Sequence, residues 1–391
     1  MQPPAPPRRR SFYDRDVQAI LWQVAVVGIV ALIGWYLYRN TIHNLQTKSI
    51  KTGFEFLWRE AGFEIGETLI DYAPTSNFFR ALLVGFLNTL HVSVIGVILA
   101  TLLGILIGIG SMSKNWLVSR LTAGYIHFLR NIPVLLHIVI WYTALISERF
   151  LPGPRAAQPL LGAYATQRGI YLPVPEAHRG WLLAFIGLIV GAILLAILQR
   201  RNRTLREATG DAPSLLKIGL GLMIGLPLIG WMLGGAPTAI SWPQLRGFNL
   251  DGGARITPEF MAILLGLSVY TSAFIAEIVR AGILAVPKGQ TEAARALGLK
   301  ETVILTQVVL PQALRVIVPP LTSQYLNLTK NSSLSVAIGY PDLVNSVNTT
   351  ITQTGQAIEG ILIIMIVFLT TSLVTSAFMN WYNQRIALVE R

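Results

Sequence analysis

Long hydrophobic runs, separated by short polar stretches, recur along the whole 391-residue chain. Several runs reach 18 residues or more, and a helix needs about 20 apolar residues to cross the hydrocarbon core of a membrane. The short alternating segments of about 10 residues that build outer-membrane barrels do not occur. The pattern therefore predicts an all-α polytopic membrane protein with about eight transmembrane helices. We place the spans at Val17–Tyr38, Ala81–Gly110, Leu121–Ile146, Trp181–Leu198, Leu215–Leu233, Pro258–Leu284, Val316–Gly339 and Ala357–Asn380.

Composition agrees with the hydrophobic pattern. The chain is 53% hydrophobic and only 13% charged, and its mean hydropathy is +0.56, which argues against two or three soluble domains. It contains no cysteine, which excludes a disulfide framework, a thiolate metal site and a cysteine nucleophile. The five histidines lack metal-ligand spacing such as HExxH, so no metal site is expected.

The formal charge of +12 is distributed unevenly between the loops. With the N-terminus inside, the five inside segments hold 17 Lys and Arg residues, and the longer outside segments hold 11. Cytoplasmic loops of membrane proteins are rich in these residues, so both termini are expected to be cytoplasmic. The basic N-terminal residues could open a signal peptide, but WYLYRN follows the apolar run without a small-x-small cleavage site. We therefore expect a retained first helix.

Two shorter patterns each leave two interpretations open. Gly96, Ala100, Gly104 and Gly108 recur at four-residue spacing, which places four small side chains on one helix face. That face could contact another subunit or pack within the chain. The outside stretch FEFLWREAGFEI, residues 54–65, is amphipathic and could lie on the membrane surface or pack on the rest of the protein.

The polar segment Lys288–Pro311 reads KGQTEAARALGLKETVILTQVVLP and lies between two apolar runs, on the predicted cytoplasmic side. Its alanines favour a helix, and Gly298 is expected to end that helix. A second amphipathic helix is expected to continue to Pro311, where proline stops it or starts the next turn. From these residues alone the segment could simply be a surface helix between two spans.

The motif EAARALG, followed by VVLP, resembles the EAA-loop signature of ABC importer permeases. The matching residues are Glu292, Ala293, Ala294, Gly298, Leu310 and Pro311. Val308 stands where the family usually has isoleucine. In that family the loop forms a coupling helix that docks in a groove of the ATPase subunit. The resemblance therefore implies that the residues coupling the chain to an ATPase are Glu292, Ala293, Ala294, Arg295, Gly298 and Leu299.

Neighbouring stretches resemble the polar amino-acid branch of these permeases: Tyr270–Gln290, Phe128–His137 and Leu328–Leu334. The resemblance divides the chain into residues 1–77 (tail, first helix and periplasmic segment), two parts of a permease core (78–150 and 258–391) and an insertion at 151–257 with two extra spans. The enlarged form resembles permeases for general L-amino acids, or for glutamate, glutamine, aspartate and asparagine.

The resemblance implies a type I ABC importer permease fold in the cell inner membrane. It implies as partners a second homologous permease, two ATPase subunits that bind ATP with Mg, and a periplasmic amino-acid-binding protein. The chain has no GxxxxGK[ST] phosphate loop, so if ATP drives transport it must bind another chain, and this chain is expected to be a transport subunit without a cofactor. The alternative is an ion-coupled secondary amino-acid transporter, which would need related halves with discontinuous helices. A membrane-embedded enzyme would need an acid–base or nucleophile–base set, and none stands out.

We single out four of the charges within the predicted spans, because charges there are costly and usually face an interior or a cavity. Glu277 and Arg280 are one helical turn apart and can pair, either as a local ion pair or as part of a gate. Arg130 precedes Asn131-Ile132-Pro133, where proline kinks the helix. Arg130 could serve the structure or the pathway.

The fourth charge, Lys330, belongs to the most polar cluster within the spans. The cluster comprises Asn327, Lys330, Asn331, Ser332, Ser333 and Ser335. These amide, ammonium and hydroxyl groups could hold the carboxylate of an amino-acid substrate, or they could form buried hydrogen bonds between helices.

Overall fold

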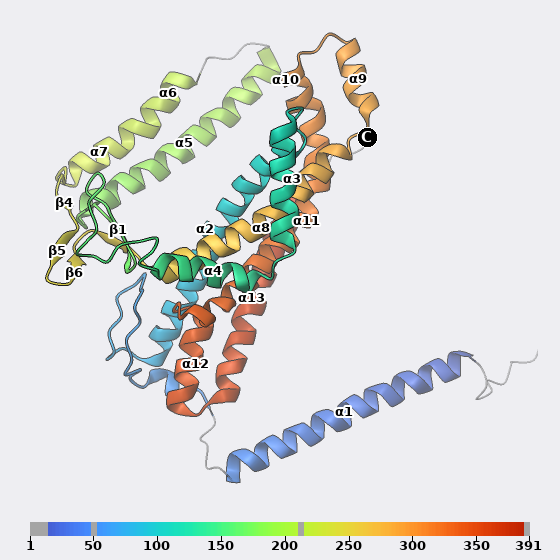
Figure 1. Ribbon diagram of the computed structural model, residues 1–391. Coiled ribbons are helices and arrows are strands. Elements are labelled where there is room, and N and C mark those ends of the chain that lie inside the picture. The colour runs from blue at the N-terminus through green and yellow to red at the C-terminus, as the bar shows by residue number, and fades with distance from the viewer. Residues whose placement is uncertain (1–14, 48–52, 210–214, 387–391) are drawn as a thin grey trace, which may run out of the picture. The chain divides into compact units, whose positions relative to one another are not determined.

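The computed structural model describes residues 15–47, 53–209 and 215–386, and helices dominate it (Figure 1). The described chain forms two compact units. The first comprises the described residues within 15–88 and 341–374, and the second comprises those within 89–340 and 375–386. The ends of the predicted cytoplasmic tails, residues 1–14 and 387–391, lie outside the described residues.

The observed helices confirm the predicted spans, with one exception. Within the described residues, seven helices are long and apolar enough to cross a membrane, or eight if one bent pair counts as a single span. The long helices are α1 Arg15–Thr47, α2 Phe78–Ser111, α5 Arg179–Thr209, α8 Pro258–Leu284, α11 Leu310–Asn331 and α13 Ala357–Ile386. The shorter span comprises α6 Leu216–Leu220, a π-helical turn η2 Gly221–Gly225 and α7 Leu226–Leu233.

The exception is the predicted span Leu121–Ile146, which is broken. Helix α3 covers Trp116–Arg130 and helix α4 covers Val134–Ile146, and their axes differ by 104°. Pro133 lies at the junction and has no N–H group to continue the first helix. The side chain of Asn131 turns back and donates to the carbonyl of His127 at 2.6 Å, which satisfies one carbonyl at the end of α3.

The first unit joins the N-terminal turns of α2 and α13 with a short 3₁₀ helix, η1 Glu55–Trp58, and with α12 Leu343–Thr354. Phe56 of η1 is fully buried in a cluster with Ala61, Phe78 and Ala81. The amphipathic stretch 54–65 therefore packs on the protein. Asn88 ties this unit together, since its amide donates to the carbonyls of Glu67 and Pro341 at 2.8 and 2.9 Å.

The core of the second unit forms around α8, whose Ile263, Leu267 and Ile275 are fully buried. The small-residue face of α2 packs within the chain. A Cβ atom at Gly104 would come within 2.5 Å of Ile275 Cγ2, and Gly96 lies against Leu328 of α11. The interpretation of this face as intramolecular packing is the one that the structure supports.

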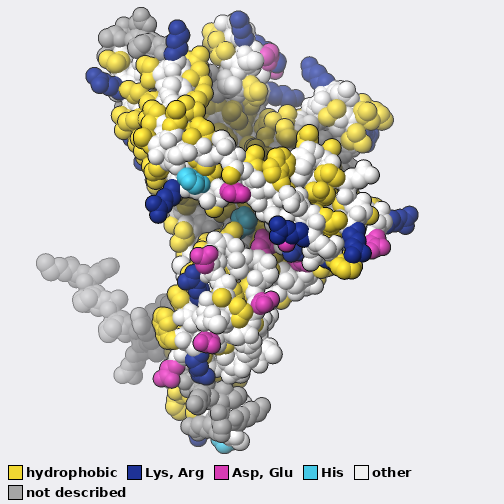
Figure 2. Space-filling view, turned by 90° about the vertical axis from the view of Figure 1, so that its left-hand side faces the viewer, with side chains coloured by type: hydrophobic (Ala, Val, Ile, Leu, Met, Phe, Trp, Pro, Cys, Tyr) yellow, Lys and Arg dark blue, Asp and Glu magenta, His cyan; other side chains and the backbone are white. Residues whose placement is uncertain are grey.

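The insertion adds a helical hairpin to the second unit, made of α5 and the α6–η2–α7 span (Figure 1). The helices approach so closely that a Cβ at Gly230 would collide with the carbonyl of Leu183. Hydrophobic side chains cover the surface of the pair, with Lys and Arg side chains near its ends (Figure 2). The hairpin therefore has the surface of a pair of membrane helices.

Seven short strands, which the hydrophobic pattern did not predict, connect the two segments that flank this hairpin. They are β1 Tyr164–Thr166, β2 Gly169–Leu172, β3 Val174–Pro175, β4 Ile240–Ser241, β5 Gln244–Arg246, β6 Asn249–Asp251 and β7 Ala254–Ile256. All pairs are antiparallel, in the sheets β1-β2-β7, β3-β4 and β5-β6. Because β2 pairs with β7 and β3 with β4, both ends of the insertion meet at the same end of the hairpin.

Candidate coupling segment and polar cluster

The segment 288–311 begins with helix α9, Lys288–Ala296, and Gly298 ends this helix as predicted. Gly298 adopts a left-handed conformation with φ +74°. Its N–H donates to the carbonyl of Arg295 at 2.9 Å, and the N–H of Leu299 donates to the carbonyl of Ala294 at 3.3 Å. This pair of bonds is a Schellman motif, which satisfies the last carbonyls of the helix and turns the chain sharply.

After the turn, a second short helical stretch leads into the membrane helix. It comprises α10 Glu301–Val303 and the π-helical turn η3 Ile304–Val309, which continues directly into α11. Pro311 occupies the first turn of α11, where its missing N–H is tolerated. The predicted short helix and glycine bend are therefore confirmed, whereas the second helical stretch is continuous with α11.

Arg295 connects the two arms of this bend. Its Nε and a terminal nitrogen bind the two carboxylate oxygens of Glu301 at 2.7 and 3.2 Å. This hydrogen-bonded contact raises the pKa of the Arg295 guanidinium above its ordinary value. The sequence alone did not predict this contact, because it is the bend that brings Glu301 beside α9.

The two faces of the segment differ in exposure. Ala294 and Ile304 are buried, at 5% and 1% exposure, and α9 packs against η3. Ala293 and Leu299 are exposed, and Leu297 is 79% exposed. The segment is thus a bend between two helical stretches that is anchored on one face and exposes small and apolar side chains on the other.

Two opposite charges lie near the C-terminal end of α8. Glu277 and Arg280 form an ion pair at 3.2 Å, and both side chains are half-buried. The guanidinium of Arg130, at the end of α3, lies 5.2 Å from the ring centroid of Phe274 on α8, within the range of a cation–π interaction. The predicted ion pair is therefore present, and Arg130 contacts the same helix without joining the pair.

The structure splits the polar cluster of α11 into two groups. Asn327 and Lys330 are exposed on the surface of the chain. Ser332 and Ser335 are buried in the 3₁₀ helix η4, Ser332–Ile338, which follows α11. Ser332 donates to the carbonyl of Thr329 at 2.7 Å, so its hydroxyl serves the local backbone.

The two remaining members of the cluster, Asn331 and Ser333, are intermediate in exposure. Asn331 is partly buried, and Ser333 donates to the carbonyl of Lys330 at 2.7 Å. Asn327 and Lys330 are therefore the most accessible members of the cluster, and Ser332 and Ser335 are the least accessible.

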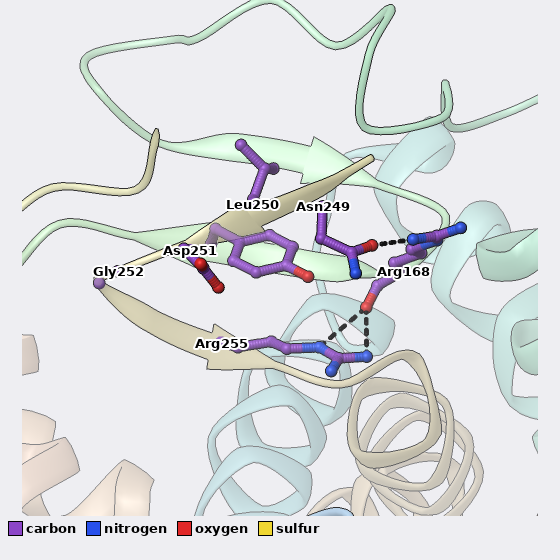
Figure 3. A pocket seen from close by; sticks show the side chains of 8 residues that line it. Arg168, Asn249, Leu250, Asp251, Gly252 and Arg255 are labelled. Carbon is purple, nitrogen blue, oxygen red and sulfur yellow. Dashed lines mark hydrogen bonds between the residues drawn. The ribbon is translucent and has the colours of Figure 1, made fainter. Parts of the chain in front are cut away.

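A depression that the sequence did not predict lies on the strands of the insertion (Figure 3). Arg255 donates twice to the carbonyl of Arg168, at 3.1 and 3.0 Å, and Arg168 bonds the side chain of Asn249. These bonds connect the turn between β1 and β2 with β6 and β7. No sequence motif predicts this cluster, because its members come from segments about 80 residues apart.

The sequence is similar to that of known membrane transport proteins. The sequence model of the family described as "Binding-protein-dependent transport system inner membrane component" matches residues 213–388. The chain is 51% identical over 387 residues to the putative amino-acid ABC transporter permease protein YhdX of Escherichia coli, with 97% of each chain covered. It is 46% identical to the general L-amino acid transport system permease protein AapQ of Rhizobium johnstonii, covering 98% of this chain and 96% of that protein.

A third relative is the glutamate/glutamine/aspartate/asparagine transport system permease protein BztB of Rhodobacter capsulatus. It is 41% identical, and the match covers 97% of this chain and 96% of that protein. Among solved structures, a crystal structure of an amino acid ABC transporter with histidines aligns with a TM-score of 0.47 and 20% identity, over 79% of this chain and 95% of that one.

The long apolar helices are those of a multi-pass membrane protein. Because relatives with 41–51% identity match over nearly their whole length, the chain belongs to the family of amino-acid ABC transporter permeases. It is accordingly a transport subunit and not an enzyme.

Proposed function

We propose that this chain is the transmembrane permease of an ATP-driven importer for L-amino acids, in the cell inner membrane. It forms the translocation pathway together with a second homologous permease. A periplasmic binding protein delivers the substrate, and two separate ATPase subunits bind ATP with Mg. Both termini and the segment Lys288–Pro311 face the cytoplasm. The observation that carries the proposal is the nearly full-length similarity to three amino-acid permeases.

The coupling role rests on the geometry of the EAA segment. The exposed side of α9 and its bend, with Glu292, Ala293, Leu297 and Leu299, would dock in a groove of the ATPase. Because α9 contacts η3 and η3 continues into α11, movement of the docked segment would pass to that helix as a rigid-body shift.

The substrate class rests on the relatives. Their names give general L-amino acids in one case, and glutamate, glutamine, aspartate and asparagine in another. We infer that this importer carries polar and acidic L-amino acids and their amides, or a broader set of L-amino acids. The exposed Asn327 and Lys330 of α11 would contribute to the translocation path, where an ammonium and an amide can bind a carboxylate.

The experiment is a mild-detergent purification of the tagged chain from its native membranes, followed by identification of the partner masses and reconstitution into proteoliposomes. A second permease and an ATPase are expected in the eluate. Uptake of labelled glutamate and glutamine is expected to need the binding protein outside and ATP at the ATPase side. A lone chain or homo-oligomer that transports amino acids without ATP would contradict the proposal and favour an ion-coupled secondary transporter.

A further inference from the structure

The first unit contains a small apolar groove between the N-terminal turns of its helices. Its floor is formed by Leu82 of α2 and Leu343 of α12, which are buried, and its walls include Phe86, Ile363 and Val367. Every lining residue is Leu, Ile, Val or Phe, and the volume is about 200 Å³. An amino acid carries a carboxylate and an ammonium, and no lining side chain of this groove could bind either one.

The groove lies at one end of two membrane spans. Its α2 residues fall in the first turns of a helix that begins at Phe78, and its α13 residues fall in the first three turns of a helix that begins at Ala357. From Phe79 to Phe86 the helix rises about 10 Å. One leaflet of the hydrocarbon core is about 15 Å thick, so the groove fits within a single leaflet.

An exposed aromatic pair marks the rim of the groove. The rings of Trp58 and Phe79 stack with their centroids 5.6 Å apart and an angle of 25°, yet the two residues are 71% and 48% exposed. Aromatic side chains gather at the level of the lipid headgroups. Exposed Arg59 and Arg80 follow these two residues in the sequence, and Arg80 Nε is fixed by the carbonyl of Asp71 at 2.6 Å.

From these observations we propose that the groove binds one acyl chain of a membrane phospholipid. The aromatic pair then lies at the interface, and the two arginines lie at the level of the phosphate. The groove is smaller than the pockets of about 300–1,000 Å³ that hold drug-sized ligands, and a whole helix with a diameter of about 10 Å cannot enter it. A flexible chain of methylene groups is narrow enough to enter a groove of this size, and its burial is favourable by the hydrophobic effect.

The test uses the complete transporter purified in detergent and analysed by native mass spectrometry for retained phospholipid. Leu83 lies on the rim and is 37% exposed, so Leu83→Trp would fill the groove from its open side. The matched control is Leu369→Trp, because Leu369 lies on α13 in the same unit, is 60% exposed and does not line the groove. Displacing about two methylene groups is expected to lower the affinity for the lipid roughly tenfold in Leu83→Trp only.

A second measurement identifies the occupant directly. A photoreactive phenylalanine analogue at Phe86, in otherwise unchanged transporter in native membranes, is expected to form a phospholipid adduct that Leu83→Trp abolishes. Equal lipid retention in Leu83→Trp and the unchanged protein would overturn the proposal. So would an adduct to the second permease or to α1 of this chain, since either would mean that protein covers the groove. Unchanged thermal stability and partner co-purification identify a folded variant.

Discussion

The guanidinium of Arg295 binds both carboxylate oxygens of Glu301 across the bend at Gly298. The two residues are six positions apart, and only the left-handed glycine brings them together. Both side chains are exposed, at 57% and 70%, so solvent and salt weaken the pair. The pair therefore contributes less to stability than to geometry, because a bidentate contact fixes the angle between the two arms of the segment.

Reversing one charge of this pair is therefore expected to impair coupling more than folding. Arg295→Glu or Glu301→Arg places like charges across the bend, whereas the double reversal restores an ion pair. We expect each single variant to lower uptake per ATP hydrolysed roughly two- to fivefold, the range for an exposed pair, and the double variant to recover most of it. Uptake and ATP hydrolysis in the same proteoliposomes measure this ratio. A double variant as poor as the singles would mean that Arg295 or Glu301 acts on the partner alone.

Substitution of Gly298 separates backbone conformation from charge. Asparagine and aspartate both tolerate the left-handed conformation that other L-residues adopt only at a cost of roughly 1–2 kcal/mol, and a Cβ at Gly298 meets nothing within 4 Å. Gly298→Asp, which adds a carboxylate to the exposed bend, is expected to stay in the membrane and to uncouple uptake from ATP hydrolysis. Asparagine is nearly isosteric with aspartate but carries no charge, so Gly298→Asn is expected to retain most uptake. Normal uptake in Gly298→Asp would contradict the docking role.

Local patterns predicted the spans and the coupling bend because their signals lie within one stretch of sequence. The run Pro258–Leu284 matches helix α8 at both ends, since proline begins it and the apolar run sets its length. Gly298 ends α9 because it is the residue best able to adopt the conformation that closes a Schellman motif. The signal and the structure are local in both cases.

The features that the sequence did not predict depend either on contacts between residues far apart in the chain or on a choice between two local conformations. The apolar run Leu121–Ile146 could have continued through a kink, and the local geometry at Pro133 instead turned it by 104°. The strands of the insertion pair segments such as β2 and β7, whose residues are too few to show a period. The partner of Arg295 became visible only once the bend was known, because Glu301 lies beyond the helix.

The packing of α2 on α8 is expected to tolerate no added side chain at Gly104. A Cβ there would lie 2.5 Å from Ile275 Cγ2 and 3.1 Å from the carbonyl of Ser272. Gly104→Ala is therefore expected to destabilise the protein by about 1–3 kcal/mol, as overpacking does, and to lower the melting temperature in detergent. Gly34→Ala on α1, where nothing lies within 4 Å, is the control. An unchanged melting temperature in Gly104→Ala would contradict this close packing of α2 on α8.

The split of the polar cluster on α11 and η4 separates transport effects from stability effects. Lys330 is exposed, so Lys330→Gln removes a positive charge from the proposed path and is expected to raise the KM for uptake of acidic amino acids without changing the melting temperature. The Ser332 hydroxyl is buried and bonded to Thr329, so Ser332→Ala is expected to lose about 1 kcal/mol of stability with an unchanged KM.

Ser335 completes this comparison because its hydroxyl is buried and has no hydrogen-bond partner among the residues that the structure describes. A buried hydroxyl without a partner costs desolvation free energy, so Ser335→Ala is expected to leave the melting temperature unchanged or to raise it slightly. Uptake kinetics and melting curves of Lys330→Gln, Ser332→Ala and Ser335→Ala, measured side by side, check all three expectations. A higher KM in Ser335→Ala with normal stability would show that this hydroxyl faces the substrate during transport, and would extend the path from the exposed face of α11 into η4.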